Sequence, residues 1–352
     1  MTNVVWDSGT AYDFFISLFV LHNPDRFGLR PSWAAGVRSR IPAYYRQFLE
    51  ETLEFLPAPL GWLNSINADS KDTKTVLESL AMIPAENRLV TLFKNQEITP
   101  EVGNTIQKIK SSQSIEQGDL DSLRQIFLKR ILPIKPRAIQ KLAQAFAASS
   151  LFGDQLLAAY ESYYEVFFKE EEIRIKPIIA RGLLDSQGMA DTLSVPALVD
   201  ELSKGVTYES METLNTLWLV PSYWCSPLIF MIEPRTNEKL MVFGCRSEEQ
   251  NLVPGEYVPD GLVIALKALS DSTRLRIASY LQEAPETPSS LAKKLRLRPP
   301  TVVHHLNIMR LAGLVQVKIS KDGERSYSLR EQAIPSLVRQ IDNFFNDKSV
   351  SS

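Results

Sequence analysis

The pattern of apolar and polar positions predicts a mostly helical first half of the chain. Tyr12 to Leu21 is almost entirely apolar, which indicates a buried helix. Between Gly153 and Arg181, apolar residues recur every three or four positions, which predicts a long helix more clearly than elsewhere in the chain. This stripe contains Leu156, Leu157, Tyr160, Tyr163, Tyr164, Phe167 and Phe168. Pro177 should bend or end the helix, and Gly182 is a plausible cap.

The pattern then changes to short runs of branched and aromatic residues. Leu217 to Val220, Leu228 to Ile232 and Leu240 to Cys245 each predict a strand. The polar stretch from Pro234 to Lys239 predicts a β-hairpin between the last two. Arg246 to Pro259 is polar with two prolines and reads as a linker.

Helical patterns resume after this linker, each with its own start signal. Leu262 to Leu269 is a short apolar helix, and Asp271 stands where an N-cap belongs. Thr287 is the expected N-cap of a third helix, and Pro288 follows at the first helical position, where its missing N–H costs no hydrogen bond. Pro299 opens a fourth helix after a tight turn.

The fourth helix divides into two faces. Val302, Leu306 and Met309 form the face that should pack onto the third helix. In a helix-turn-helix, the outer residues of the second helix enter the major groove. We therefore predict DNA contacts from Pro300, Thr301, Val303, His304, Asn307 and Arg310. Asparagine pairs with adenine, and threonine or valine methyl groups touch thymine. His305 is either structural or base-reading.

Two alternating strands follow, Val315 to Ser320 and Arg325 to Leu329, which predict a wing. Asp322-Gly323 between them is a signal for a two-residue hairpin turn. Lys321 and Arg325 near its tip are suited to phosphates or the minor groove, or else belong to a solvated turn. A final stripe packs on its own domain or forms a dimer contact: Leu337, Val338, Ile341, Phe344 and Phe345.

Three linked motifs give this region a family resemblance. Ala268 to Ile277, Thr301 to Leu306 and Leu311 to Val315 resemble the opening, recognition-helix and wing-link signatures of ArsR-type winged-helix regulators. The match covers roughly 85 residues in order. The resemblance implies a homodimer built from the first and last helices of the domain. It also implies a repressor that binds operator DNA and is released by an inducer.

The sequence departs from the family pattern at two places. Val303 stands where the family often has serine. Ser289, Ser290 and Leu291 stand where metal-sensing members carry cysteines on the third helix, and the last helix lacks the family's Asp/His/Glu set for zinc. The resemblance therefore argues against metal sensing, and we expect neither a metal nor a cofactor.

A length of 352 residues suggests two or three domains, and the patterns above predict a mainly α protein with minor β. We expect a helical N-terminal domain with a small β portion at 1–250, for regulation or dimerisation, and the winged helix-turn-helix at 260–346. The net charge of −2 hides an asymmetry. Residues 260–345 carry 13 Lys and Arg against 8 Asp and Glu, a net of +5, while residues 1–259 carry 25 against 32, a net of −7. The basic end is therefore the candidate surface for phosphates.

Other features leave alternatives open or exclude classes. The apolar stretch from Phe14 to Leu21 is too short to span a bilayer and lacks the flanks of a secretory signal, so we expect a cytoplasmic protein without a membrane partner. Two cysteines, Cys225 and Cys245, exclude a cysteine framework. They are either buried thiols or a redox pair.

The N-terminal domain is the least informative part of the sequence. Its stripe from Tyr160 to Phe168 and the group Trp218, Tyr223 and Trp224 either fill a core or line a pocket for a small-molecule inducer. No phosphate loop, Gly-x-Gly-x-x-Gly or Gly-x-Ser-x-Gly occurs, and His22 is the single histidine outside the fourth helix. We therefore expect no enzyme. A winged-helix scaffold for protein partners and an enzyme with a DNA-binding tail remain the alternatives.

Overall fold

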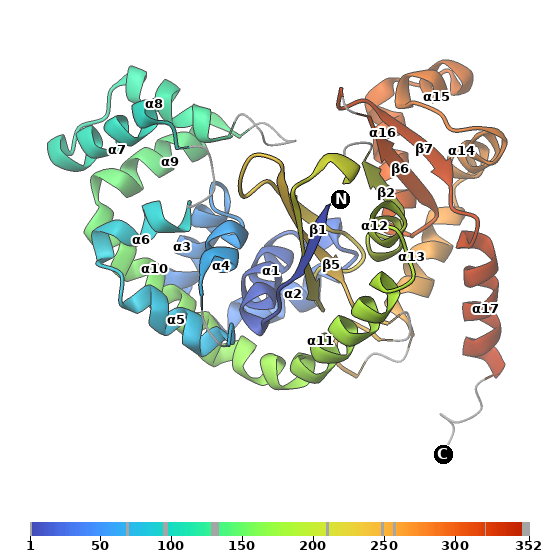
Figure 1. Ribbon diagram of the computed structural model, residues 1–352, viewed down its shortest axis with the longest axis horizontal. Helices are drawn as coiled ribbons and strands as arrows, with labels where there is room; N and C mark the ends of the chain where they lie inside the picture. Colours follow the sequence, from blue (N-terminus) through green and yellow to red (C-terminus); the bar gives the residue numbers. More distant parts are fainter. Residues whose placement is uncertain are drawn as a thin grey trace.

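The computed structural model describes residues 2–67, 70–93, 98–127, 134–208, 211–247, 250–255, 258–320 and 322–346. The described chain is mainly helical with two small sheets, as predicted (Figure 1). The helices before residue 203 curve around the first sheet, and the described residues from 260 to 346 form a body at one end of this curve (Figure 1). No described helix is both long and apolar enough to cross a membrane.

The first sheet lies at the centre of the molecule. Its strand order is β1 (Asn3–Trp6), β3 (Thr216–Ser222), β5 (Glu238–Gly244) and β4 (Phe230–Ile232). β1, β3 and β5 are parallel, and β4 is antiparallel to β5. The predicted hairpin is thus confirmed as β4 and β5. β1 and its parallel pairing with β3 were not predicted, and they unite segments more than 200 residues apart.

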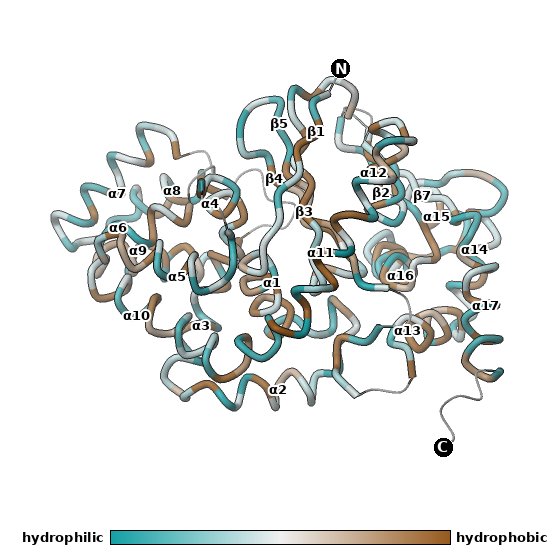
Figure 2. Tube along the Cα trace, turned by 60° about the horizontal axis from the view of Figure 1, so that its bottom comes forward, coloured by the Kyte–Doolittle hydropathy of each residue, from teal (hydrophilic) through white to brown (hydrophobic). Residues whose placement is uncertain are grey.

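Helix α1 (Thr10–His22) follows β1 and is buried along nearly its whole length. The predicted buried helix at Tyr12 to Leu21 is therefore confirmed. Hydrophobic colour is concentrated in this central part of the molecule, along β3 and α1 (Figure 2). His22 ends the helix, its Nδ1 lies 2.8 Å from the Leu18 carbonyl oxygen, and burial lowers its pKa.

The helices that follow wrap around this centre. Several begin with proline at the first helical position, where its missing N–H removes no hydrogen bond. They are α2 (Pro31–Ser39), α3 (Ala43–Leu53), α4 (Leu60–Ser65), α5 (Thr73–Ala81), α6 (Ala85–Leu92), α7 (Pro100–Ser112), α8 (Gln117–Arg124) and α9 (Pro136–Ala147). Short 3-10 turns occupy Pro24–Arg26 and Gln125–Phe127.

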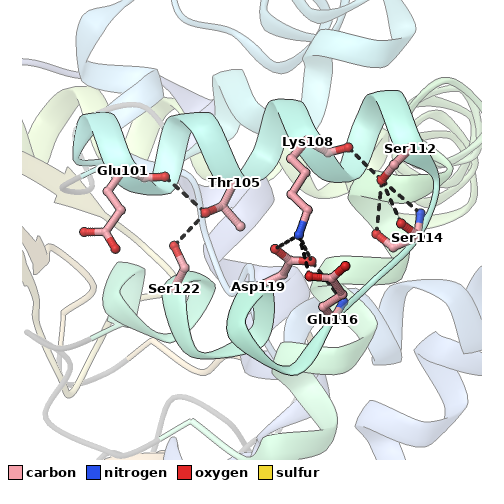
Figure 3. A network of polar contacts seen from close by, with 8 residues as sticks. All are labelled: Glu101, Thr105, Lys108, Ser112, Ser114, Glu116, Asp119 and Ser122. Carbon is pink, nitrogen blue, oxygen red and sulfur yellow. Dashed lines mark hydrogen bonds and ion pairs between the residues drawn. The ribbon is translucent and has the colours of Figure 1, made fainter.

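Polar contacts align α7 and α8 at one tip of the curve (Figure 3). Lys108 on α7 donates to Glu116 over 2.8 Å and to Asp119 over 3.0 Å. Thr105 and Ser122 lie 2.9 Å apart at their hydroxyl oxygens. Because Lys108 is about half exposed, these pairs orient the two helices more than they stabilise them.

The long helix extends further than predicted. It runs from α10 (Ser149–Tyr163) through a π-helical segment (Tyr164–Phe168) into α11 (Lys169–Ala190). The predictions that Pro177 bends or ends the helix and that Gly182 caps it are wrong in this respect: α11 continues through both. Ile175 and Ile179 are buried on either side of Pro177, and this packing outweighs the lost hydrogen bond. Gly182 instead allows a close approach, because a Cβ there would lie 2.4 Å from the Cβ of Cys245.

The aromatic residues of the N-terminal part fill its core. Tyr163, Phe168 and Trp224 are completely buried, and the ring of Tyr163 contacts that of Phe14 at 5.2 Å. The structure thus favours the core alternative for these rings. Cys225 and Cys245 are free thiols, and burial raises the pKa of both, as in buried structural cysteines.

The C-terminal body follows the predicted order of helices and strands. Its helices are α13 (Asp260–Leu269), α14 (Ser272–Glu283), α15 (Pro288–Leu295), α16 (Pro299–Leu311) and α17 (Ala333–Asn346). Its strands are β6 (Val315–Ile319) and β7 (Arg325–Leu329), which pair antiparallel. They have a core of their own, which includes Ile277, Leu291, Leu306 and Tyr327.

The two parts of the chain are joined at two places. β2 (Val206–Tyr208), which follows α12 (Val195–Leu202), pairs with β6 to make a second sheet of order β2-β6-β7. The segment predicted as a linker is held as well, because the Asp260 carboxylate accepts from the amide of Leu252 over 2.9 Å and pairs with Arg246 at 3.3 Å.

A buried carboxyl lies where α1 passes the end of β3. Asp13 is completely buried, and its Oδ1 accepts from the Ser222 hydroxyl at 2.8 Å and the Trp224 amide at 2.7 Å. Its Oδ2 has no partner within the described chain. Burial raises the pKa of Asp13 to about 7, against the opposing effect of these hydrogen bonds.

We expect Asp13→Asn to remove a pH dependence of stability. With a folded pKa raised from 3.8 to about 7, the folded protein holds a proton that the unfolded chain has lost. Wild-type stability therefore falls as the pH rises from about 4 to about 7. Asparagine keeps an acceptor for Ser222 and Trp224 without the charge, so the variant should be about 1–4 kcal/mol more stable than wild type at pH 8.

Urea unfolding between pH 4 and pH 8 measures this effect. Ser114→Ala, in an exposed polar position, serves as the control and should keep the wild-type slope. A variant that retains the full slope would contradict the assignment to Asp13.

Candidate DNA-binding surface

Helices α15 and α16 form a helix-turn-helix whose boundaries the local sequence specifies. The Thr287 hydroxyl accepts from the Ser290 amide over 3.2 Å, and Pro288 occupies the first position of α15, as predicted. Arg296 ends α15 in the left-handed region at a φ of 56°. Pro299 then begins α16.

One face of α16 is buried in the C-terminal core. Val302, Leu306 and Met309 have no exposed surface, which confirms the predicted packing face. Burial of each such side chain contributes about 1.5–3 kcal/mol. These three contacts therefore determine the rotation of α16 about its axis.

The opposite face lies open. Pro300, Thr301, His304 and Asn307 are exposed, and Val303 is half-buried beside them. Spacings of three residues place Thr301, His304 and Asn307 close together on a helix. Five of the six predicted contacts on this helix are thus brought together near its N-terminal end.

Arg310 differs from these five residues. It is half-buried at the last turn of α16, and burial lowers its pKa while the phenols of Tyr327 and Tyr208 oppose that effect. Arg310 therefore lies near Tyr327 of β7 and Tyr208 of β2. The predicted DNA contact from Arg310 remains a prediction, with a position apart from the other five.

Polar contacts of Asp271 and Arg274 hold the start of α14, the helix that precedes the helix-turn-helix. Asp271 caps α14 by accepting from the Arg274 amide over 3.0 Å, as predicted. The Arg274 guanidinium donates to the Ala268 carbonyl over 2.6 Å, which ties α14 to α13. His305 is half-buried, and burial lowers its pKa. This position favours the structural alternative for His305.

The wing extends beside α16. Gly323 has a φ of 81°, the conformation expected of glycine in this turn, and Arg325 is exposed at the start of β7. The prediction of a two-residue turn at Asp322-Gly323 is wrong. Ile319 pairs with Arg325 and the Ser320 amide donates to the Glu324 carbonyl, so the connection between the strands is longer than two residues. Lys321 lies outside the described residues.

The structure adds cations that the sequence analysis passed over. Arg296 and Arg298 are exposed in the turn before α16, and Lys318 is exposed on β6. The signal for the two arginines in the sequence is the run of basic residues around the turn, which also contributes to the net positive charge of this part of the chain. Among described residues, no three His, Cys, Asp or Glu side chains gather so as to hold a metal ion.

A helix-turn-helix followed by a two-stranded wing, with an exposed polar face on the second helix, defines a winged-helix DNA-binding domain. Comparison with known families narrows this class. Residues 271–317 match the family described as "Bacterial regulatory protein, arsR family". The C-terminal part of the chain therefore carries an ArsR-type helix-turn-helix, the domain of a DNA-binding transcriptional regulator.

A curated relative matches a stretch of the chain about as long as one such domain. The chain is 29% identical over 84 residues to "Transcriptional repressor SdpR" of Bacillus subtilis (strain 168). That alignment covers 23% of this chain and 88% of the relative. No solved structure gives a significant match. The family match leaves residues 1–270 uncovered, and the relative matches less than a quarter of the chain.

Replacing Asn307 or His304 with alanine should weaken specific DNA binding by about 1–3 kcal/mol and relax base preference, because both side chains occupy the exposed face of α16. Fluorescence anisotropy with a recovered binding site and a shuffled duplex measures both effects. Gln140→Ala, an exposed helical amide on α9, is the control. Unchanged base preference in both variants would show that another face enters the groove.

Proposed function

We propose that the protein is a homodimeric transcriptional repressor that binds double-stranded operator DNA under the control of a signal acting on its N-terminal region. The observation that carries this proposal is the exposed outer face of α16, flanked by exposed cations and a wing. The name of the relative, a transcriptional repressor, supports the direction of regulation.

The exposed residues suit both kinds of DNA contact. Asn307 is suited to adenine, and the methyl groups of Thr301 and Val303 to thymine, with His304 and Pro300 at the same surface. Arg296, Arg298 and Arg325 supply charge for phosphates, as does Lys321 from its place in the sequence. Base preference thus comes from α16, and salt-dependent affinity from its cationic flanks.

Helices α13 and α17 provide the surface for a second copy. Leu262, Ala265 and Leu337 are buried where these helices pack together. Their outer sides expose apolar residues that a monomer leaves in water: Leu266 at 47%, Ile334 at 41%, Val338 at 51% and Phe345 at 77%. A two-fold interface would cover this surface and place two α16 helices about 34 Å apart, the spacing of successive major grooves.

We propose a signal other than a metal ion. Ser289, Ser290 and Leu291 on α15 offer no thiolate or imidazole, the usual ligands of transition metals. A small-molecule inducer acting on the N-terminal region fits the size of this region, which DNA binding alone does not require.

Genomic footprinting of the purified full-length chain tests the proposed function. We expect protected, roughly palindromic sites upstream of genes, with affinity that falls steeply as salt rises. Absence of salt-dependent retention on promoter DNA would favour a scaffold for protein partners. Turnover of a metabolite by the chain would favour an enzyme with a DNA-binding tail.

Arg325→Ala should weaken binding to all duplexes alike, because an exposed cation at the wing neutralises phosphate without reading bases. The slope of log affinity against log salt should fall by about 1. Salt titrations with operator and shuffled duplexes give this slope. Arg137→Ala, an exposed arginine on α9, is the matched control, and an equal loss in both variants would argue against a wing contact.

Val338→Asp should convert the dimer to a monomer, because it places a charge in the exposed apolar face of α17. Sedimentation velocity should show halved mass, and operator affinity should fall by a factor of about 100 or more as avidity is lost. Ile173→Asp is the control, since Ile173 is also exposed on a helix, at 74%. A Val338→Asp variant that remains dimeric would place the interface elsewhere.

A further inference from the structure

The N-terminal region contributes a strand to the wing of the DNA-binding domain. β2 runs parallel to β6, with Val206, Thr207 and Tyr208 opposite Val317, Lys318 and Ile319. On the other side, β7 is bridged by Glu286. β2 therefore covers the edge of β6 that would otherwise expose unpaired backbone groups. The two strands, β2 and β6, lie side by side in Figure 1.

The start of β2 is held from both directions. The Val317 amide donates to the Gly205 carbonyl over 2.7 Å. The Val206 amide donates to the Ser203 hydroxyl over 2.8 Å, which anchors the strand to the end of α12. A force on α12 is thus transmitted to the wing through one short segment.

The side chains of β2 also connect two cores. Val206 is 3% exposed and belongs to the core of the winged helix. Tyr208 packs against that core and against the core formed by α12, β3 and β5. The Lys239 ammonium lies 4.5 Å from the centre of the Tyr208 ring. Arg310 at the end of α16 is half-buried near Tyr208, which opposes the lowering of the Arg310 pKa, so the recognition helix ends beside the same joint.

The joint is tight at Gly205. This residue has a φ of 97°, which side chains rarely adopt. A Cβ there would lie 2.7 Å from the Cβ of Gln316 on β6. A residue with a side chain therefore cannot occupy position 205 while β2 stays paired as it is.

We infer that β2 is a coupling strand, through which the N-terminal region sets the orientation of the winged helix and so the spacing of the two recognition helices. This inference rests on the proposed function. A strand of three residues offers few hydrogen bonds, so its release from β6 costs chiefly the burial of Val206 and Tyr208. A signal that moves α12 can then change the fraction of paired molecules.

Gly205→Ala tests the inference in the full-length protein. Hydrogen exchange should show at least tenfold faster exchange of the Val317 amide than in wild type, because its acceptor moves away. Gly255→Ala is the matched control: its φ is 75°, yet a Cβ there would meet nothing within 4 Å. Val206→Ala is the second variant, since it loosens the same joint without backbone strain.

Operator spacing measures the functional consequence. The probes are a duplex with a footprinted site and the same duplex with its half-sites two base pairs further apart, a change of about 7 Å and about 70°. Wild type and Gly255→Ala should bind the altered duplex at least about 100-fold more weakly, as one half-site is lost. Gly205→Ala and Val206→Ala should lose less than about tenfold.

The outcomes separate the inference from the proposed function. Unchanged Val317 exchange in both joint variants, or faster exchange with full spacing discrimination, would overturn the coupling role alone. Failure of wild type to protect any genomic site would overturn the proposed function and this inference with it. Faster exchange together with relaxed spacing supports the coupling strand.

Discussion

The burial of one side of α16 is the constraint on which the functional surface depends. Val302, Leu306 and Met309 are withdrawn completely from water, and rotating the helix would expose them. Each would lose about 1.5–3 kcal/mol of burial, comparable in total to the stability of a whole domain. Thr301, His304 and Asn307 are thus presented outward because their neighbours must remain inside.

The turn before α16 reinforces this constraint. Arg296 adopts the left-handed conformation that ends α15, and Pro299 is suited to begin the next helix. Arg296 and Arg298 are consequently exposed next to the polar face. The same local geometry that redirects the chain therefore gathers positive charge beside the groove-reading residues.

The N-terminal region is built into the DNA-binding domain rather than tethered to it. The pairing of β2 with β6 and the contacts of Asp260 with Arg246 and Leu252 hold the winged helix at two separate places. Two attachments restrict rotation far more than one linker does. A change in the N-terminal body therefore has a physical route to α16, provided that a signal binds the two arrangements with different affinity.

The sequence by itself determined the C-terminal domain, because its signals are local. Caps at Asp271 and Thr287, the proline at 299, the glycine at 323 and the apolar spacing of α16 each act within a few residues. Tertiary structure decided the features that depend on distant partners. β1 and β2 are short and find their pairing strands about 210 and 110 residues away. Pro177 and Gly182 continue a helix because burial and close packing override local preference, and Arg310 is half-buried for the same reason: packing energy is set by neighbours that no short stretch of sequence contains.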